Sequence, residues 1–296
     1  LNDDVFFDKS KKLVISVDTF VEGIHFVNFK NPDLVIKKII RSSISDLICK
    51  GVNPKYYFIS GSGNKKSFSK RNLNKISKSL DDEQKKYKIK LCGGDTTKSK
   101  ILSFTIVSLG FANKIITRNN AKLHDDIYVT GNLGDSYMGL KVLQKKISLN
   151  NRMKNYFEKK YYLPNLQLNL ANKLFNFANT SMDISDGLFD DMKKLINKQK
   201  LSFRLYLNQI PISKNLQNLI LVKKLKKISF VSNGDDYQIL FTASPSKLRI
   251  INKTAKSLGI RITKIGKICN HSTKSQIFDE KLKKIDPYHQ GYYHRF

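Results

Sequence analysis

The sequence predicts an α/β (α+β) fold in two parts, and three observations lead to that prediction. Apolar runs with the spacing of strands alternate with stretches in which apolar residues recur at helical spacing. The chain has 296 residues, which is enough for two domains of ordinary size. The pattern also resets around Asn119-Asn120. We therefore expect an N-terminal α/β domain over residues 1–119 and a C-terminal α/β domain over residues 120–296.

The N-terminal part opens with a predicted strand and a long predicted helix. Residues 13–17 form a short apolar run that predicts a buried strand, with Asp18-Thr19 at its end. Asn31-Pro32 begins a helix, because Asn is a good cap and Pro is favoured at the first helical position. Gly51 ends it. Asp46 lies on or beside the apolar stripe of this helix, where an ordinary amphipathic helix would carry lysine.

Two more strands are expected before the boundary. Tyr87, Ile89 and Leu91 alternate with lysines, which predicts a half-buried strand that runs into a Gly-Gly-Asp-Thr-Thr turn over residues 93–97. Residues 102–109 follow as another strand, with hydroxyl residues interleaved among the apolar ones.

The C-terminal part alternates strands and helices in the same way. Residues 127–130 predict a strand, a glycine-bearing turn follows at residues 131–135, and a helix is expected near residues 138–143. Such a strand, turn and helix can cradle a phosphate, although the signal is weak by itself. Further helices are expected over residues 167–178, 188–196 and 245–259, and further strands over residues 203–207, 237–241 and 260–268.

Composition limits the function classes. The formal charge of +30 comes from 54 basic and 24 acidic residues, which invites a nucleic-acid interpretation. Only eight of the basic residues are arginine, and the lysines spread along the whole chain, so a solvated lysine coat is favoured. Three scattered cysteines and no apolar run of membrane length predict a soluble protein of the reducing cytoplasm, without a membrane or nucleic-acid partner.

Aspartates recur in short segments beside apolar residues, glycines or hydroxyl residues. A carboxylate at the end of an apolar run is costly to desolvate, so the recurrence indicates a compensating magnesium ion and phosphoryl chemistry. Two carboxylates about 4 Å apart repel by roughly 4 kcal/mol at an effective dielectric near 20. The alternative, surface or capping roles, stays open for each aspartate taken alone. The segments are Asp3-Asp4, Asp18-Thr19, Ser45-Asp46, Gly93-Gly94-Asp95-Thr96-Thr97, Asp183-Ile184-Ser185-Asp186-Gly187 and Gly234-Asp235-Asp236-Tyr237.

The order of these segments resembles that of the thiamine-monophosphate kinase family. The resemblance covers nearly the whole chain, and several motifs in the right order are more specific than any one of them. It also includes Ile15 to Phe26, Thr117-Arg118, Tyr128-Val129-Thr130-Gly131 and Gly134-Asp135. It implies a two-domain fold shared with aminoimidazole ribonucleotide synthetase, a homodimer, and ATP bound in a cleft between chains or domains. It also implies transfer of the γ-phosphoryl group of ATP to thiamine phosphate, giving thiamine diphosphate and ADP.

The resemblance also implies roles for individual residues. Several magnesium ions would be bound by Asp4, Ser16, Val17 (through its carbonyl), Asp18, Asp46, Asp95, Asp183 and Asp186. ATP would contact Tyr87, Gly94, Asp95, Arg118 and Ser185, and thiamine phosphate would contact His25, Asp235 and Tyr292. No catalytic base is expected, because the attacking phosphate oxygen is already ionised at neutral pH and the transfer is direct, in line and magnesium-assisted. Packing for His25 and a linker charge for Arg118 are the competing interpretations.

The chain departs from the family pattern in places. Asp235 and Gln238 stand where the family carries glutamates, which leaves substrate affinity or identity open. The resemblance also implies that further residues precede Asp3-Asp4. Three rival hypotheses are another ATP-dependent enzyme of the same superfamily, such as a ribonucleotide or selenophosphate synthetase, an inactive homologue, and a basic nucleic-acid-binding protein. The last would bind with a steep dependence on salt and regardless of the aspartates.

Overall fold

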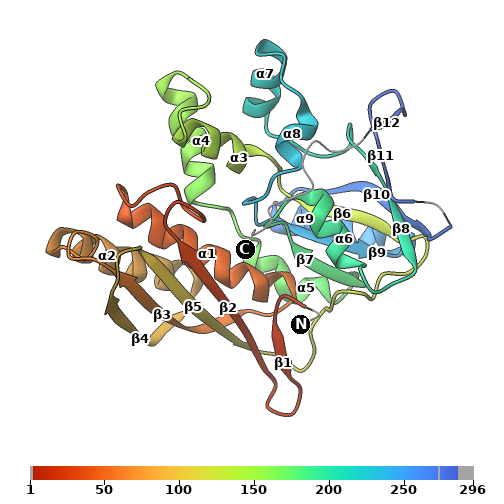
Figure 1. Cartoon of the computed structure of the whole chain (residues 1–296). Helices are drawn as coiled ribbons and strands as arrows, with labels where there is room; N and C mark the ends of the chain where they lie inside the picture. The colour runs from red at the N-terminus through yellow and green to blue at the C-terminus, as the bar shows by residue number, and fades with distance from the viewer. Residues whose placement is uncertain (1–2, 273, 286–296) are drawn as a thin grey trace.

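Two β-sheets form the framework of the chain (Figure 1). The computed structural model describes residues 3–272 and 274–285. The first sheet has five strands in the order β1-β2-β5-β3-β4, and the second has seven in the order β12-β11-β8-β10-β6-β9-β7. The mixture of helices and sheets confirms the predicted fold class. The expected boundary near residue 119 falls between the two sheets, and as a domain boundary it stays a prediction.

The five-stranded sheet is covered by helices on one face. Val14 and Phe20 of β2 and Phe104 and Ile106 of β5 are buried on the face that packs against α1 (Pro32–Cys49). The odd-numbered residues of β2 and β5 point to the other face, where several apolar side chains stay exposed. Helix α2 (Lys70–Tyr87) packs beside α1. The strands are β1 (Phe6–Asp8), β2 (Leu13–Val21), β3 (Pro54–Gly63), β4 (Lys90–Lys98) and β5 (Ser103–Phe111).

The seven-stranded sheet packs against helices on both faces. Tyr128 and Phe241 lie in the large core that also contains the apolar stripe of α1. Ile127 and Leu240, of opposite parity, lie in a second core with α6 (Leu188–Leu195). The strands are β6 (Asp126–Thr130), β7 (Thr180–Asp183), β8 (Leu201–Tyr206), β9 (Ile239–Ala243), β10 (Ile262–Asn270), β11 (Gln276–Phe278) and β12 (Lys284–Ile285). Shorter helical segments are η1 (Leu168–Leu170), α5 (Ala171–Leu174), η2 (Pro245–Lys247) and α9 (Leu248–Leu258).

A third group of helices stands above both sheets in Figure 1. Met138, Phe157, Leu216 and Phe230 form its small core. Gly139 makes the close approach of two helices possible, because a Cβ there would lie 2.2 Å from the carbonyl oxygen of Phe157. The helices are α3 (Asp135–Leu143), α4 (Asn151–Tyr162), α7 (Lys214–Val222) and α8 (Lys227–Val231).

Four sequence-based expectations were wrong in detail. The strand expected over residues 13–17 continues to Val21, so Asp18 lies inside β2 instead of at its end. Tyr87 ends α2 and is not part of a strand. Gly94 and its neighbours are not a turn, because they pair with β3 in a parallel ladder that extends β4 to Lys98. Pairing with a neighbouring strand outweighed the turn preference of the glycines. The helix expected over residues 167–178 is reduced to η1 and α5.

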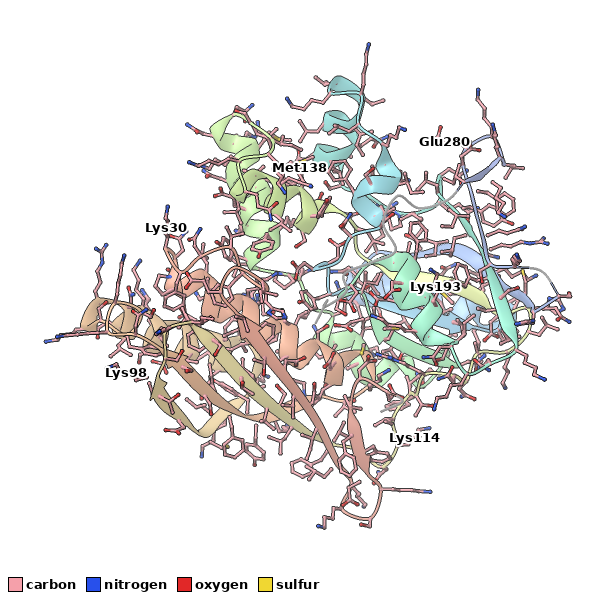
Figure 2. All side chains as sticks on the ribbon, viewed as in Figure 1. Lys30, Lys98, Lys114, Met138, Lys193 and Glu280 are labelled. Carbon is pink, nitrogen blue, oxygen red and sulfur yellow. The ribbon has the colours of Figure 1, made fainter. Side chains whose placement is uncertain are left out.

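Lysine side chains extend outward from both parts of the molecule (Figure 2). The labelled Lys30, Lys98, Lys114 and Lys193 come from well-separated places on the ribbon. No helix in the described part of the chain is both long and apolar enough to cross a membrane.

Candidate active site

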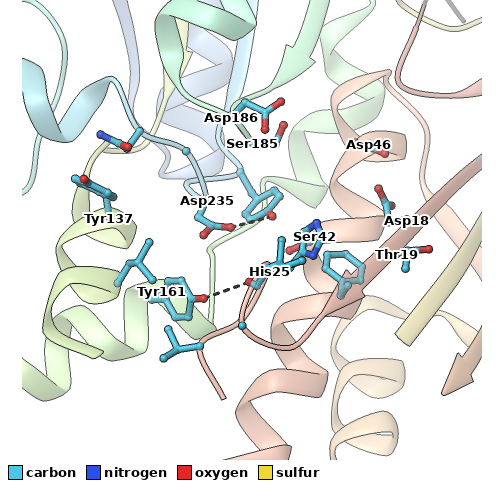
Figure 3. Close-up of a pocket in the computed structure, with 18 of the residues that line it drawn as sticks. Asp18, Thr19, His25, Ser42, Asp46, Tyr137, Tyr161, Ser185, Asp186 and Asp235 are labelled. Carbon is cyan, nitrogen blue, oxygen red and sulfur yellow. Dashed lines mark hydrogen bonds between the residues drawn. The ribbon is translucent and has the colours of Figure 1, made fainter. Parts of the chain in front are cut away.

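A cleft of about 740 Å³ lies between the first sheet, α1, α3 and the loops that follow β7 and precede β9. Asp18 and Thr19 of β2 and Ser42 and Asp46 of α1 lie on one side (Figure 3). Ser185, Asp186 and Asp235 from the two loops lie on the other side. Tyr137 and Tyr161 complete the wall between the two sides. The cleft is therefore built by segments that are far apart in the sequence.

The two loops of the second side press closely on each other. A Cβ on Gly234 would lie 1.7 Å from the carbonyl oxygen of Ser185, so only glycine fits there. Gly187 has a φ of +130° and would place a Cβ 2.2 Å from the carbonyl oxygen of Ser232. The backbone N–H of Asp235 donates to the Ser185 carbonyl at 2.9 Å. These contacts fix Asp186 and Asp235 on the same side of the cleft.

Carboxylates from β2, α1 and β7 form an acidic centre at the floor of the cleft. Ser16 Oγ donates to Asp46 Oδ2 at 2.5 Å and lies 3.4 Å from Asp18 Oδ2. The third carboxylate, on Asp183, accepts a hydrogen bond of 2.7 Å from Ser45 Oγ. The Ser16 hydroxyl thus connects Asp18 and Asp46, and the Ser45 hydroxyl binds Asp183, while no described hydrogen bond to a cation neutralises Asp18 or Asp46.

The electrostatics of this centre are unfavourable without a cation. Burial raises the pKa of Asp46 well above its ordinary value, and the nearby carboxylates of Asp18 and Asp183 raise it further. Burial also raises the pKa of Asp18, and it raises that of Asp183 to about 6. Oxygen donors that converge and repel one another are suited to a hard divalent cation such as magnesium. The residues present therefore fit the implied metal.

A second acidic group is formed by Asp186 on the loop after β7 and by Asp190 and Asp191 in the first turn of α6. Asp191 Oδ2 accepts hydrogen bonds of 3.0–3.1 Å from the backbone N–H groups of Ser185, Asp186 and Gly187, which fixes the loop. Carboxyl oxygens of Asp186, Asp190 and Asp191 lie within 4.8 Å of one another. Lys194 forms ion pairs with all three, at 3.0 Å from Asp190 and in closest contact with Asp186. Asp186 is thus held by a lysine that is partly exposed.

A third charged group connects the N-terminal segment to both sheets. Lys50 Nζ lies 2.6 Å from Asp3 Oδ1 and 2.6 Å from Asp4 Oδ2, and it donates to the carbonyl oxygen of Ser181 at 2.6 Å. The Arg118 guanidinium pairs with Asp4, and the Arg118 backbone N–H donates to Asp3 Oδ2 at 2.9 Å. Asp4 is therefore engaged by two cations.

The opposite end of the cleft is aromatic and carries Asp235. Lys38 Nζ donates to Asp235 Oδ1 at 2.8 Å and lies 3.9 Å from the centre of the Tyr161 ring. The Tyr237 hydroxyl donates to the same oxygen at 3.1 Å. His25 Nδ1 accepts from the backbone N–H of Val21 at 3.0 Å, so the imidazole is held at the rim of the cleft.

The structure brings many of the predicted site residues together. Val17, Asp18, His25, Asp46, Ser185, Asp186 and Asp235 line the cleft. Ser16 and Asp183 lie next to them through the contacts described above. Asp4 and Arg118 lie in the Lys50 group instead of the lining.

Three predicted ATP contacts lie away from the cleft within this chain. The buried Tyr87 lies near Arg41 at the end of α2, and Gly94 and Asp95 lie on the exposed edge strand β4. The predicted substrate contact Tyr292 lies outside the described residues. The roles of all these residues stay predictions.

Sequence reasoning missed four side chains that shape the cleft or its surroundings. Ser42 and Tyr161 line the cleft, Lys38 pairs with Asp235 of its lining, and Lys50 pairs with Asp3 and Asp4 outside the lining. The sequence of α1 contained a usable signal. Lys38, Ser42 and Lys50 are separated by multiples of four residues, so they form a polar stripe along a helix that is otherwise buried.

The comparisons with known proteins identify the class. Residues 2–112 match the family model described as AIR synthase related protein, N-terminal domain. The thiamine-monophosphate kinase of Buchnera aphidicola subsp. Schizaphis graminum is 34% identical over 279 residues, covering 94% of this chain and 85% of the relative. The thiamine-monophosphate kinase of Haemophilus influenzae is 31% identical over 87% of this chain and 78% of its own length.

A solved structure gives the same assignment. The structure described as AaThiL complexed with AMPPCP and TMP has a TM-score of 0.86 and 25% identity, and the match covers 99% of this chain and 92% of that one. The fold and the cleft thus define a protein related to AIR synthase. Within that class, the chain belongs to the thiamine-monophosphate kinase family.

Proposed function

We propose that this protein transfers the γ-phosphoryl group of ATP to thiamine phosphate, giving thiamine diphosphate and ADP. The observation that carries the proposal is the acidic centre of Asp18, Asp46 and Asp183, which lies at the floor of a cleft large enough for both substrates. The family membership makes the chain an ATP-dependent phosphotransferase.

We infer that magnesium is bound by the acidic centre and by Asp186 across the cleft. The Ser16 hydroxyl and the Val17 carbonyl would add oxygen donors, and Asp4 and Asp95 remain further predicted ligands. When bound, magnesium neutralises phosphate charge and favours an in-line approach of the two substrates. Lys194 must release Asp186 for this residue to bind a cation, and its partial exposure leaves room for that movement.

The chain's own residues orient the two substrates. Ser185 lies between the acidic groups, where its hydroxyl is placed to donate to a phosphate oxygen of ATP. Asp235 and His25 lie at the aromatic end, which suits the thiamine moiety of the acceptor. The carboxylate of Asp235 complements the positive charge of a thiazolium ring. No residue needs to remove a proton, because a phosphate monoester oxygen is ionised at neutral pH.

We also propose that two copies of this chain form a homodimer. The outward face of the first sheet carries exposed apolar side chains that are unusual for the surface of a monomer. Gly94 and Asp95 on the adjacent edge strand lie far from the cleft of their own chain, so in a dimer they would serve the partner's ATP. The exposed residues are Phe6, Val17, Tyr56, Phe58 and Phe111. We also propose a cytoplasmic location, because three scattered cysteines are typical of a protein in a reducing compartment.

The test is a direct assay with ATP, magnesium and thiamine phosphate, followed by chromatography or phosphorus NMR. Magnesium-dependent thiamine diphosphate and ADP are expected. ADP and inorganic phosphate without thiamine diphosphate would instead indicate another ATP-dependent enzyme of the superfamily. ATP with magnesium should also raise the melting temperature more than ATP with a chelator, and equal shifts would remove the magnesium proposal. No ATP binding at all would indicate an inactive homologue.

A further inference from the structure

Lys50 is an unusual residue for its position. It caps the C-terminus of α1, and its side chain has no solvent exposure. A lysine is almost never fully buried unless it is paired, because removing an ammonium group from water is costly. The C-terminal end of a helix favours a cation, which offsets part of this cost.

The partners of Lys50 form a cage of oxygen atoms around its ammonium group. Asp3 Oδ1, Asp4 Oδ2 and the Ser181 carbonyl oxygen each lie 2.6 Å from Nζ. Asp3 and Asp4 are largely buried themselves. Carboxylate and carbonyl oxygens from two separate segments, Asp3-Asp4 and β7, also make up the kind of donor set that holds a divalent ion. Here the position among them is filled by a side chain.

The charge of Lys50 also acts on the acidic centre. Burial is the largest influence on the pKa of Asp46 and of Asp183, and in both cases Lys50 opposes it. Ser181 and Asp183 belong to the same strand, β7, so the ammonium group lies beside the floor of the cleft. The Ser181 hydroxyl donates to the carbonyl of Cys49, which holds β7 against the end of α1.

We propose that Lys50 is a built-in cation of the active site, which occupies at Asp3 and Asp4 the position that a divalent metal ion would otherwise take. The divalent ions in the cleft then bind at Asp18, Asp46 and Asp183 and at Asp186 across from them, and none binds at Asp3 and Asp4. The inference rests on the proposed function, because it assumes that the acidic centre binds magnesium. We therefore expect the protein to bind one divalent ion fewer than it would if Asp3 and Asp4 also held a metal ion.

The test counts bound Mn²⁺ by electron paramagnetic resonance in the full chain, without nucleotide. Lys50→Met keeps an unbranched side chain of similar length and removes the charge. We expect it to bind about one more Mn²⁺ per chain than the wild type, since Asp3 Oδ1 and Asp4 Oδ2 lose their ammonium partner while Arg118 stays on the other two carboxylate oxygens. The double variant Lys50→Met/Asp4→Asn should lose that additional ion. Lys253→Met, the same exchange on the exposed surface of α9, is the matched control.

Thermal unfolding gives a second readout. In EDTA, Lys50→Met should melt roughly 10 °C below the wild type, because Asp3 and Asp4 lose their ammonium partner and keep only their contacts with Arg118. Adding Mn²⁺ should restore most of the lost melting temperature in Lys50→Met. It should raise the melting temperature of the Lys253→Met control much less. Equal numbers of bound Mn²⁺ in Lys50→Met and the wild type would overturn the proposal.

The single variant Asp4→Asn, which keeps Lys50, tests whether Asp4 is a metal ligand even if Lys50→Met fails to fold. The proposal predicts an unchanged number of bound Mn²⁺, because Asp4 already has its cation. Loss of an ion would show that Asp4 is a metal ligand beside Lys50, and would overturn the proposal. Wild-type protein that binds no Mn²⁺ and makes no thiamine diphosphate would instead overturn the proposed function itself.

Discussion

Ser16 Oγ on β2 and Asp46 Oδ2 on α1 are 2.5 Å apart, and this hydrogen bond joins the first sheet to the helix that covers it. The same hydroxyl lies 3.4 Å from Asp18 Oδ2. Because a hydroxyl has one proton, it donates fully to only one of these carboxylates at a time. The pair of aspartates is therefore incompletely satisfied by the protein, which leaves affinity for a cation.

Asp46→Asn should abolish turnover while the fold survives. The substitution removes one of three repelling carboxylates, and the amide side chain that replaces it keeps an oxygen that can accept from Ser16. We expect a melting temperature in EDTA equal to or above that of the wild type, and loss of magnesium-dependent stabilisation. Thermal unfolding with and without magnesium, together with the kinase assay, measures both. Asp81→Asn on the exposed surface of α2 is the control. Near-normal turnover of Asp46→Asn at low magnesium would show that Asp46 does not bind the ion.

Stability of the metal-free protein should fall as the pH rises from about 4 to about 8. Burial raises the pKa of Asp183 to about 6 and that of Asp191 to about 8. A carboxyl group with a raised folded-state pKa binds its proton more tightly in the folded chain than in the unfolded one. Its contribution to stability is complete below the unfolded pKa and is lost as the pH passes the folded pKa. Each group contributes a slope of at most about 1.4 kcal/mol per pH unit.

Melting temperatures in EDTA between pH 5 and pH 9 measure this slope. Asp191→Asn should flatten it between pH 6 and pH 8, since the titrating group is removed and one oxygen is retained for the loop N–H groups. A melting temperature independent of pH over this range in the wild type would contradict the prediction.

Lys38→Met should raise the KM for thiamine phosphate and leave the KM for ATP nearly unchanged. Lys38 Nζ donates to Asp235 Oδ1, and a hydrogen bond to a charged group contributes about 1.5–3 kcal/mol. Loss of this contact frees Asp235 to turn away from the cleft, so we expect a rise of about tenfold or more in the KM. Lys37→Met is the control, because Lys37 is adjacent in sequence and pairs with Asp82 away from the cleft. Equal effects on both KM values would argue for a general loss of structure.

Phe58→Lys should convert the proposed homodimer to a monomer. Phe58 lies on the outward face of the first sheet with 40% of its surface exposed, and burying a lysine charge in an apolar interface is costly. Sedimentation velocity should show the change in mass, accompanied by weaker ATP binding if Gly94 and Asp95 serve the partner's site. Leu221→Lys, at an exposed apolar position at the end of α7, is the control and should leave the mass unchanged. A wild-type protein that sediments as a monomer would contradict the proposal.

The sequence predicted the fold class and several of the polar residues that line the cleft. Asp18, Asp46, Asp186 and Asp235 were found because each lies in a short segment beside apolar residues, glycines or hydroxyl residues, and the structure places all four around one cavity. Their convergence depends on strand pairing and helix packing, which local patterns do not contain. The order of the motifs along the chain supplied that information, because it resembles the order in a family whose members share one fold.

Other features of the site could not be predicted for equally physical reasons. In a chain rich in lysine, only the spacing of Lys38 and Lys50 along the predicted helix distinguishes them before their burial is known. The glycines of β4 have low strand propensity, and pairing with β3 overrides it. The contribution of Tyr161 follows from the packing of α4 against α1, which is a tertiary contact.

Helix α1 carries both ends of the site on one rigid element. Lys38 holds Asp235 at the acceptor end, and Asp46 lies eight residues later at the acidic centre. With a rise of 1.5 Å per residue, these two positions are roughly 12 Å apart along the helix axis. In the proposed arrangement of substrates, the helix therefore sets the distance between the thiamine ring near Asp235 and the phosphate at the acidic centre. An acceptor with a longer or shorter spacer between the two would reach only one end at a time.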